Sequence, residues 1–315
     1  MIKVSFVIPC YNSESTIEKV TGDIIKAVEA YPGDMEYEII LINDNSPDGV
    51  WSVITKLSEE NRKIHGFRLS KNFGQYAALM AGYKKATGDI IISLDDDGQT
   101  PAAESLVLID KLDEGYDVVF GRYMERRDSS FRKFGTYINK IMSESLIGKP
   151  KHIDVTSFFA MKRFVAESIT QYENPYPYIA GLVFRTTINC ANVDIKHEHR
   201  MEGKSGYTFK KLMTLWLNGF TSFSIKPLRL ATILGFICSA VGFAFTVYTI
   251  VDRIINPDLP AGYSALASMI LFIGGVIMIM LGVIGEYIGR LYISINKAPQ
   301  YIIKDTTDKD KNPVN

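Results

Sequence analysis

Two long runs without a charged residue occupy the last third of the chain. The first extends from Ala231 to Val251 and the second from Leu259 to Gly285. A helix needs about 20 predominantly apolar residues to cross the hydrocarbon core of a bilayer, and both runs are long enough. A pair of core helices this long and this apolar would be unusual in a soluble domain of the remaining size. The sequence therefore predicts two transmembrane helices.

Basic residues predict how these helices are oriented. Lysine and arginine flank the pair at its two ends, at Lys226, Arg229, Arg290, Lys297 and Lys304. The connecting loop holds only Arg253. Because cytoplasmic flanks carry the excess of Lys and Arg, both ends are expected in the cytoplasm and the loop around Asn256 outside. We therefore expect a multi-pass protein of the inner (cell) membrane.

The remaining composition favours a reducing compartment for the rest of the chain. Cys10, Cys190 and Cys238 form no close pair, which fits neither a disulfide framework nor a zinc site. The apolar segment at the N-terminus is too short for a signal peptide and starts directly with strand-forming residues. Lys+Arg and Asp+Glu balance at 35 each, so the overall charge indicates no nucleic-acid partner.

Before the apolar runs, short β-favouring segments alternate with helical patterns. Strands are expected at 4–8, 37–42, 66–69, 90–94 and 117–121, and helices at 50–61, 74–86 and 101–114. Further strands are expected at 153–161 and, as strand or hairpin, at 184–197. Strands that alternate with helices predict an α/β fold with a mostly parallel, doubly wound (Rossmann-like) sheet. Such sheets bind ligands at the carboxyl ends of their strands.

The strand at 90–94 ends in three carboxylates. Asp95, Asp96 and Asp97 follow its apolar residues directly, and Gln99 comes two residues later. Because side chains alternate along an extended chain, Asp95 and Asp97 are expected on one side and Asp96 on the other. Carboxylate and amide oxygens suit a hard divalent cation. The alternative is that these acids cap the helix opened by Pro101.

Polar residues also follow the first two strands. Pro9, Tyr11 and Asn12 come after the first strand, and Asp44 and Ser46 after the second. Together with the acidic loop, they are expected to converge on one edge of the sheet.

Two common nucleotide-binding motifs are missing. No G-x-G-x-x-G follows the first strand, which argues against a dinucleotide dehydrogenase. Gly-Lys-Ser at 203–205 lacks the preceding glycine of a P-loop, because Glu198 stands there.

A basic segment follows the strand at 117–121. It contains Arg122, Arg126 and Arg132, with few acids in the same window. The planar fork of arginine binds oxyanions through two hydrogen bonds, so phosphate binding is predicted. A solvated charged face is the alternative. Asp154, early in the next strand, is as compatible with a surface position as with a functional one.

Four parts of the chain are expected. They are a cytoplasmic α/β domain (1–206), an amphipathic juxtamembrane segment (207–229), a transmembrane hairpin (230–290) and a cytoplasmic tail (291–315). The juxtamembrane segment combines Trp216 with lysines and apolar residues, which is typical of an interfacial helix. A buried core helix is the alternative. The two spans can also pack between copies of the chain, which leaves a homo-oligomer open.

The combined motifs resemble those of a known family. They are Pro9-x-Tyr11-Asn12, Asp44-x-Ser46, Asp95-x-Asp97-x-Gln99, Arg200 and a pair of spans that ends Gly285-Glu286-Tyr287-Ile288-Gly289-Arg290. The chain resembles the polyisoprenyl-phosphate glycosyltransferases, inverting family-2 enzymes of the GT-A fold. Dolichyl-phosphate mannose synthase and the bacterial undecaprenyl-phosphate glucosyl- and aminoarabinosyltransferases belong there. The resemblance extends to about Lys304.

The resemblance implies a role for each matching residue. The donor nucleotide-sugar would be held by Pro9, Tyr11, Asn12, Ser13, Asp44, Ser46, Asp95, Asp96, Arg200 and Lys204. A Mg²⁺ or Mn²⁺ ion would be bound by Asp95, Asp97 and Gln99. The diphosphate and the lipid phosphate would be bound by Arg122, Arg126, Arg132 and Arg200. Asp154 matches an acid near the acceptor, so the catalytic set implied is Asp95, Asp97, Asp154 and Arg122.

The sequence departs from the family pattern at several of these positions. Ser13 stands where the family usually has Glu, and the acid follows at Glu14. Asn43 replaces a common Asp, and Gly98 replaces an apolar residue in the acidic loop. Gly206 stands where the family has a lysine, so that charge is either supplied by Lys204 or absent.

The implied reaction is the metal-dependent transfer of one sugar, with inversion, from a nucleotide-diphospho-sugar to a polyprenyl phosphate such as undecaprenyl phosphate, for cell-envelope glycan or lipid modification. A UDP-sugar is favoured. A mannosyltransferase that uses GDP-mannose is an alternative, because Asp44 can accept from a ring N–H of uracil or guanine. A membrane-anchored scaffold that binds nucleotide-sugar without turnover is another. A processive polysaccharide synthase would carry Gln-x-x-Arg-Trp and more spans, and the sequence has neither.

Overall fold

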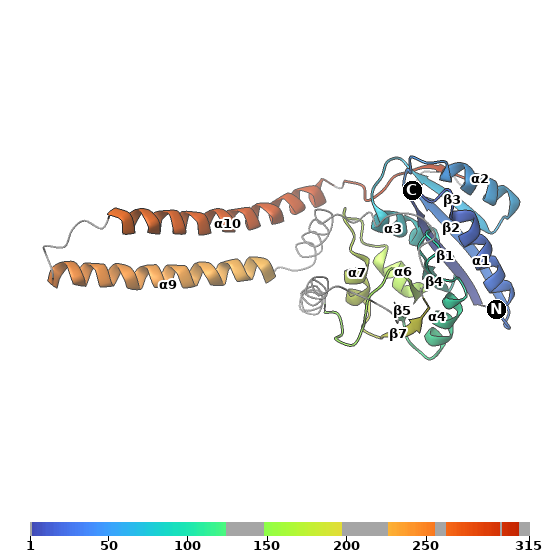
Figure 1. The fold of residues 1–315 in the computed structure, drawn as a ribbon, viewed down its shortest axis with the longest axis horizontal. Helices are drawn as coiled ribbons and strands as arrows, with labels where there is room; N and C mark the ends of the chain where they lie inside the picture. The colour runs from blue at the N-terminus through green and yellow to red at the C-terminus, as the bar shows by residue number, and fades with distance from the viewer. Residues whose placement is uncertain (1, 124–147, 197–225, 256–262, 297, 309–315) are drawn as a thin grey trace. The chain divides into compact units, whose positions relative to one another are not determined.

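The computed structural model describes residues 2–123, 148–196, 226–255, 263–296 and 298–308 (Figure 1). The chain divides into two compact units. The first comprises Met1–Leu212 with Lys297–Asn315, and the second comprises Met213–Asn296. Residues 207–225 of the predicted juxtamembrane segment and the predicted external loop around Asn256 lie outside the described residues, and residues 226–229 form the start of α9.

The first unit is built on one sheet, for which the described residues supply eight strands in the order β7-β5-β6-β4-β1-β2-β3-β8. Their bounds are β1 Ile2–Cys10, β2 Met35–Asn43, β3 Ile64–Leu69, β4 Ile90–Ser93, β5 Val118–Tyr123, β6 Phe159–Lys162, β7 Cys190–Ile195 and β8 Ile303–Thr306. The pairs β1–β2, β1–β4, β2–β3 and β5–β7 are parallel. The antiparallel pairs all involve β6 or β8. The predicted mostly parallel α/β sheet is therefore confirmed.

Helices cover both faces of this sheet, so its central strands are buried on both sides (Figure 1). The helices are α1 Ile17–Glu29, α2 Val50–Glu60, α3 Gln75–Lys85, α4 Glu104–Asp113, α6 Arg163–Ile169 and α7 Ile179–Thr186 (Figure 1). Phe6 and Ile8 of β1 belong to one apolar cluster with residues of α1, α2 and α4. Val7, on the opposite face, meets α3, where a Cβ on Gly82 would lie 2.3 Å from Val7 Cγ1. A glycine at 82 thus lets α3 lie close against β1.

Two expected strands differ from those observed. The segment expected as a strand at 153–161 is extended only from Phe159, and residues 154–158 form an irregular connection. Thr156 there bonds the carbonyls of Gly121 and Phe158 through its hydroxyl. The segment expected at 184–197 begins inside α7, and only Cys190–Ile195 is a strand. A short apolar run such as 179–184 has no periodicity that separates a buried helix from a buried strand.

The tail after the second apolar run supplies a strand that the sequence did not reveal. β8 pairs antiparallel with β3, and the side chain of Thr307 accepts from the Gly66 amide at 2.8 Å. The Ser70 amide donates to the Ile302 carbonyl at 2.9 Å, just past the end of β3. The tail therefore protects an edge of the sheet that would otherwise expose unpaired amides.

The second unit is a pair of long helices, α9 Lys226–Ile255 and α10 Tyr263–Ile295, which contact each other. Among the described residues, one helix is long and apolar enough to cross a membrane, and its apolar window is Phe272–Gly289 in α10. The comparable stretch of α9, Gly235–Phe245, is shorter. Large apolar side chains such as Phe272 and Met278 are exposed on α10, as expected for a surface that faces lipid. For both helices, spanning the membrane stays a prediction.

Candidate active site

Three loops meet at the carboxyl edge of the parallel strands β1, β2 and β4. The amide of Tyr11, after β1, donates to Asp96 Oδ2 at 2.9 Å, after β4. The amide of Asn12 donates to Ser46 Oγ at 2.8 Å, after β2. The Asp44 amide also donates to the Cys10 carbonyl at 3.1 Å. These bonds confirm that the polar loops converge on one edge. Which of their residues touch a ligand stays a prediction.

Asp44 is a buried carboxylate held by the loop that precedes α3. Its two oxygens accept from the amides of Phe73 and Gly74, at 2.7 and 2.8 Å. Burial raises the pKa of Asp44 above its usual value, and these two bonds offset part of that rise. The neighbouring Asn43 has a structural role, because its side-chain oxygen accepts from the Ser46 amide at 2.8 Å. Asn43 therefore fixes the shape of the β2 loop, and Asp44 ties that loop to the segment before α3.

The Asp95 carboxylate is positioned by two side chains from other parts of the chain. Gln75 Nε2 donates to Asp95 Oδ1 at 2.9 Å, and Ser157 Oγ donates to Asp95 Oδ2 at 2.5 Å. The sequence reasoning did not select Gln75 or Ser157. The sequence signal for them is weak: Gln75 is a polar residue at the start of the helix expected at 74–86, and Ser157 is a polar residue shortly after Asp154. Their contact with Asp95 is a product of the fold.

A tight turn follows Asp95. The Asp97 side chain accepts from the Gln99 amide at 3.1 Å through Oδ1. Gly98 between them has a φ of 67°, a left-handed conformation that glycine adopts at little cost. This turn explains why glycine stands at 98 where the family has an apolar residue, and it brings Asp97 and Gln99 together.

Asp96 differs from its two neighbours. It lies partly buried against the β1 loop, where it accepts from the Tyr11 amide and its carbonyl accepts from Thr16 Oγ1 at 2.6 Å. Burial raises the pKa of Asp96 to about 6, although the bond from Tyr11 acts in the opposite direction. Asp96 thus ties β4 to β1, a contact that the predicted nucleotide role did not include.

The raised pKa of Asp96 predicts a pH-dependent stability. A carboxyl whose pKa rises on folding stabilises the folded state while it is protonated, and this contribution is lost as the pH rises through about 6. Asp96→Asn keeps a neutral acceptor for the Tyr11 amide. We therefore expect the variant to be more stable than wild type at pH 7.5, by about 1 kcal/mol after allowance for partial solvent access. At pH 5 the difference should be about half as large, because the contribution is lost gradually between the ordinary pKa of about 4 and the folded value of about 6.

Thermal unfolding of the metal-free protein in EDTA at the two pH values measures this effect. A stability difference of the same size at pH 5 and pH 7.5 would contradict the assignment of a raised pKa to Asp96.

Arg122 lies near the end of β5, and Asp154 lies in the irregular connection that precedes β6. Arg122 Nε donates to Asp194 Oδ1 of β7 at 2.6 Å, and this bond raises the pKa of the already basic guanidinium, with the charge of Asp154 acting in the same direction. Both Arg122 and Asp154 are exposed. Arg126, Arg132, Arg200 and Lys204 lie outside the described residues, and their roles remain predictions.

The remaining predicted residues belong to the β1 loop. Pro9 is buried within β1, Ser13 is buried behind the loop, and Tyr11 is exposed. The Glu14 carboxylate accepts from the Gly49 amide at 2.8 Å. Glu14 therefore links the β1 loop to the start of α2.

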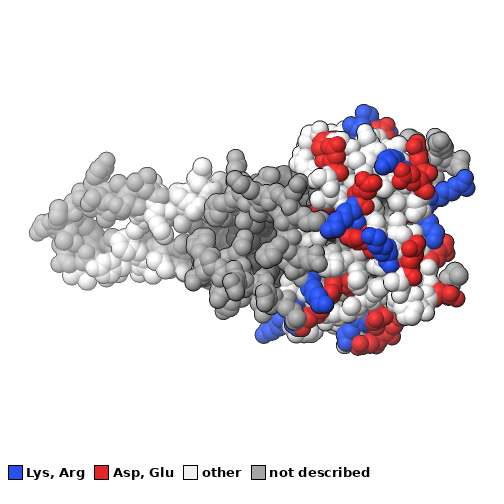
Figure 2. All heavy atoms as spheres, turned by 45° about the vertical axis from the view of Figure 1, so that its right-hand side comes forward, with Lys and Arg blue, Asp and Glu red and all other residues white. Residues whose placement is uncertain are grey.

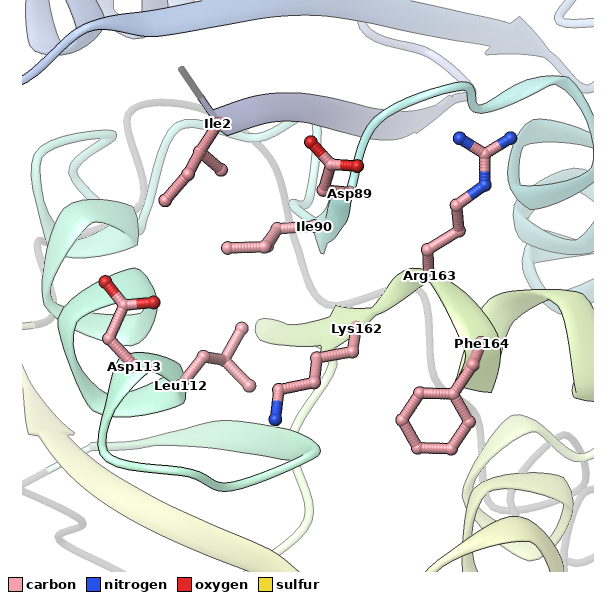
Figure 3. Close-up of a pocket in the computed structure, with 8 residues that line it drawn as sticks. All are labelled: Ile2, Asp89, Ile90, Leu112, Asp113, Lys162, Arg163 and Phe164. Atoms are coloured by element: carbon pink, nitrogen blue, oxygen red, sulfur yellow. The ribbon is translucent and has the colours of Figure 1, made fainter.

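A shallow pocket elsewhere in the first unit is distinct from this edge. It is formed at the amino ends of β1 and β4 with the end of α4 and the start of α6, has a volume of about 370 Å³, and is lined by Ile2, Asp89, Ile90, Leu112, Asp113, Lys162, Arg163 and Phe164 (Figure 3). The Arg163 side chain there pairs with Glu167 at 2.9 Å. Acidic and basic side chains are interspersed over the face of the first unit in Figure 2.

The residues of the acidic loop fit a divalent cation that also binds a substrate. Among the residues that the structure describes, no group of three His, Cys, Asp or Glu side chains could hold a metal ion. Asp95, Asp97 and Gln99 offer oxygen ligands only, and Mg²⁺ is often bound by one or two carboxylates together with substrate phosphates. The set therefore suits a cation whose coordination a diphosphate completes.

A mostly parallel sheet with acidic loops at its carboxyl edge defines the GT-A class of fold. Residues 5–170 match the family "Glycosyl transferase family 2", and residues 226–291 match "GtrB C-terminal hairpin". The chain belongs to glycosyl transferase family 2. It is therefore a glycosyltransferase with a hairpin at 226–291 of the kind expected to associate with a membrane.

Similar proteins cover almost the whole chain. An undecaprenyl-phosphate 4-deoxy-4-formamido-L-arabinose transferase of Proteus mirabilis is 33% identical over 96% of this chain and 93% of its own length. A prophage bactoprenol glucosyl transferase homolog of Escherichia coli is 34% identical over 96% of this chain and 99% of its own. A crystal structure of glucosyl-3-phosphoglycerate synthase from Mycobacterium tuberculosis, with Mn²⁺, uridine diphosphate and phosphoglyceric acid, shares the fold (TM-score 0.50, 17% identity, 68% and 74% covered).

Proposed function

We propose that the chain transfers a single sugar from a nucleotide-diphospho-sugar, preferably a UDP-sugar, to a polyprenyl phosphate such as undecaprenyl phosphate. The observation that carries the proposal is the full-length similarity to two undecaprenyl-phosphate or bactoprenol sugar transferases, hairpin included. The acidic edge of the sheet supports it, because donor sites lie at the carboxyl ends of such strands. The reaction serves cell-envelope glycan or lipid modification.

The proposed chemistry is an inverting displacement. An oxygen of the lipid phosphate attacks the anomeric carbon, the bond from that carbon to the diphosphate oxygen breaks, and the electron pair leaves with the nucleoside diphosphate. A phosphate monoester has a second pKa of about 6, so the nucleophile is already anionic near pH 7 and needs no strong base. The main barrier is the charge that develops on the leaving diphosphate.

We assign the residues of the acidic loop to stabilising the charge that develops on the leaving diphosphate. Asp95, Asp97 and Gln99 would hold Mg²⁺ or Mn²⁺, which supplies Lewis acidity to the leaving group. The crystal structure that shares the fold contains Mn²⁺ with uridine diphosphate, which supports this choice of ion. Arg122 would donate to phosphate oxygens through its terminal nitrogens, and Asp154 would orient the acceptor.

The donor nucleoside is assigned to the loops of β1 and β2. Asp44 would accept from a ring N–H of the base, with the Phe73 and Gly74 amides holding its carboxylate in place. Pro9, Tyr11, Asn12 and the β2 loop around Ser46 would form the rest of the nucleoside site. Uracil and guanine both offer that ring donor, so GDP-mannose is the alternative donor.

Transfer of radiolabelled sugar to extractable lipid tests the function. Purified protein in detergent is given undecaprenyl phosphate with UDP-glucose, UDP-N-acetylglucosamine or GDP-mannose in turn, with Mg²⁺ or Mn²⁺. Label in the organic phase with at least one donor is the expected result. Binding of nucleotide-sugar without any labelled lipid would instead support the scaffold without turnover.

The proposal places the catalytic unit on the cytoplasmic side of the inner membrane, where nucleotide-sugars are made, and the connection between α9 and α10 outside. Asn256→Cys in a Cys238→Ser background tests it, because Cys10 and Cys190 are buried. We expect a membrane-impermeant maleimide to label this variant in intact cells. Labelling that appears only after permeabilisation would reverse the topology.

A further inference from the structure

The side chain of Asn192, in strand β7, bonds the backbone of Asp154. Asn192 Oδ1 accepts from the Asp154 amide at 2.8 Å, and Asn192 Nδ2 donates to the Asp154 carbonyl at 2.7 Å. The same Nδ2 lies 3.2 Å from the Phe120 carbonyl of β5. An amide side chain that pairs with both backbone groups of one residue fixes the position and direction of that residue. Asp154 is therefore anchored through its main chain, and its carboxylate is left to act elsewhere.

Strand β7 also bonds the side chain of Arg122, which belongs to the neighbouring strand β5. In the parallel β5–β7 ladder Arg122 stands directly opposite Asp194, and the side chains are joined by the 2.6 Å bond from Nε. Asn192 and Asp194 are two residues apart, so both project from the same face of β7. A bond through Nε limits rotation of the guanidinium plane and leaves the terminal nitrogens out of this bond.

The segment that follows Asp154 connects this side of the site to the acidic loop. Thr156 bonds the carbonyl of Gly121 at 2.8 Å, and Ser157 bonds Asp95 at 2.5 Å. Before it, the Lys149 ammonium bonds the carbonyls of Pro150 and Ile153. Residues 149–157 are thus held at several points, and Asn192 is the contact that fixes Asp154 itself.

We propose that β7 is the positioning strand for the acceptor side of the site, with Asn192 aligning Asp154 and Asp194 aligning Arg122 toward the phosphate of the lipid acceptor. The inference rests on the proposed function and goes beyond it, because it separates an acceptor side at β5, β6 and β7 from a donor side at β1, β2 and β4. Asn192 and Asp194 need not touch either substrate.

Energetics favour a positioning role over a purely structural one for Asp194. Arg122 and Asp194 are 47% and 44% exposed, and ion pairs this exposed usually contribute little to stability. A short displacement of a reacting or binding group, by contrast, can reduce a rate by about 100-fold. The pair should therefore matter for kinetics and hardly at all for unfolding.

The chain offers a matched control for Asn192. Asn189, just before β7, also donates through its side-chain amide to a backbone carbonyl, that of Gly115 at 2.9 Å. It lies at the amino end of β7, away from the carboxyl edge. Asn189→Ala therefore removes a similar bond from the same strand without touching the acceptor side.

Steady-state kinetics of the full chain in detergent test the proposal, with undecaprenyl phosphate and the nucleotide-sugar that gives the highest wild-type rate. For Asn192→Ala we expect kcat/KM for undecaprenyl phosphate to fall by about 10- to 100-fold. The KM for the nucleotide-sugar should change less than about twofold, since the donor side is intact. Asn189→Ala should behave as wild type, and thermal unfolding of both variants checks that each is folded under the assay conditions.

Two substitutions of Asp194 separate alignment from charge. Asp194→Asn keeps an oxygen that can accept from Arg122 Nε, whereas Asp194→Ala removes it. We expect Asp194→Ala to lose acceptor kcat/KM and Asp194→Asn to retain most of it. Equal losses in both, or a gain in acceptor affinity in both, would mean that Asp194 acts through its charge and would overturn its positioning role.

The outcomes also separate this inference from the proposed function. A wild-type protein that transfers no sugar to undecaprenyl phosphate removes the proposed function and the inference with it. An active wild type in which Asn192→Ala leaves acceptor kinetics unchanged, or raises the KM of both substrates equally, overturns the inference alone. If Asn192→Ala does not fold, Asp194→Ala and Asp194→Asn still decide the question, because their side chains are exposed.

Discussion

Asp97→Asn is expected to lower the turnover of sugar transfer by at least about 100-fold. The neutral amide is a poorer ligand for Mg²⁺ or Mn²⁺ than a carboxylate, so the charge on the leaving diphosphate would be stabilised less. The fold should survive, because the asparagine oxygen can still accept from the Gln99 amide that now bonds Asp97 Oδ1. Transfer of labelled sugar at a range of metal concentrations measures the loss.

Two further measurements make this result specific to the metal. Mn²⁺ together with a nucleoside diphosphate should raise the melting temperature of wild type, because a ligand of the folded state stabilises it, and Asp97→Asn should lose that rise. Asp113→Asn, at the end of α4 beside the opposite-edge pocket, should keep both activity and the rise. Full transfer activity in Asp97→Asn would remove Asp97 from the metal site.

Arg122→Ala should reduce kcat/KM for sugar transfer by about 10- to 100-fold. A hydrogen bond to a charged group contributes about 1.5–3 kcal/mol, and Arg122 is assigned to the phosphate of the lipid acceptor. Stability should change little, because Arg122 and its partner Asp194 are both exposed. Kinetics with each substrate varied in turn, together with thermal unfolding, measure the two effects separately.

Arg163 is the matched control for Arg122. It is equally exposed, at 47%, and also pairs with a carboxylate through Nε, that of Glu167 at 2.9 Å. It lies at the opposite edge of the sheet, beside the pocket in Figure 3. Arg163→Ala should leave transfer unchanged. If both variants kept wild-type kinetics, the basic side chain at 122 would be part of a solvated charged face.

Local patterns were sufficient for the elements that build the donor side. β1 and β4 are short apolar segments flanked by polar loops, and their burial on both faces follows from that composition. The acidic loop could be placed at the end of β4 for the same reason. β8 could not, because Ile303–Thr306 has no strand pattern of its own. It is a strand because the edge of β3 offers unpaired backbone groups.

The partners of the acidic residues could not be predicted from sequence. The sequence placed Asp96 in the acidic loop but did not predict that its carboxylate bonds the Tyr11 amide. Asp95 was recognised, but its contacts with Gln75 and Ser157 join residues far apart in the chain. A hydrogen bond depends on distances of about 3 Å, and no pattern of residue types sets distances on that scale.

The sequence by itself determined the α/β domain, the apolar hairpin and the acidic strand end, because each depends on which residues are apolar and at what spacing. The tertiary structure decided how the acids are used, which side chains hold them, and that β7 bonds Asp154 and Arg122. Burial follows from composition and periodicity, which act locally along the chain. Alignment of a site depends on contacts between distant segments, which exist only once the sheet has formed.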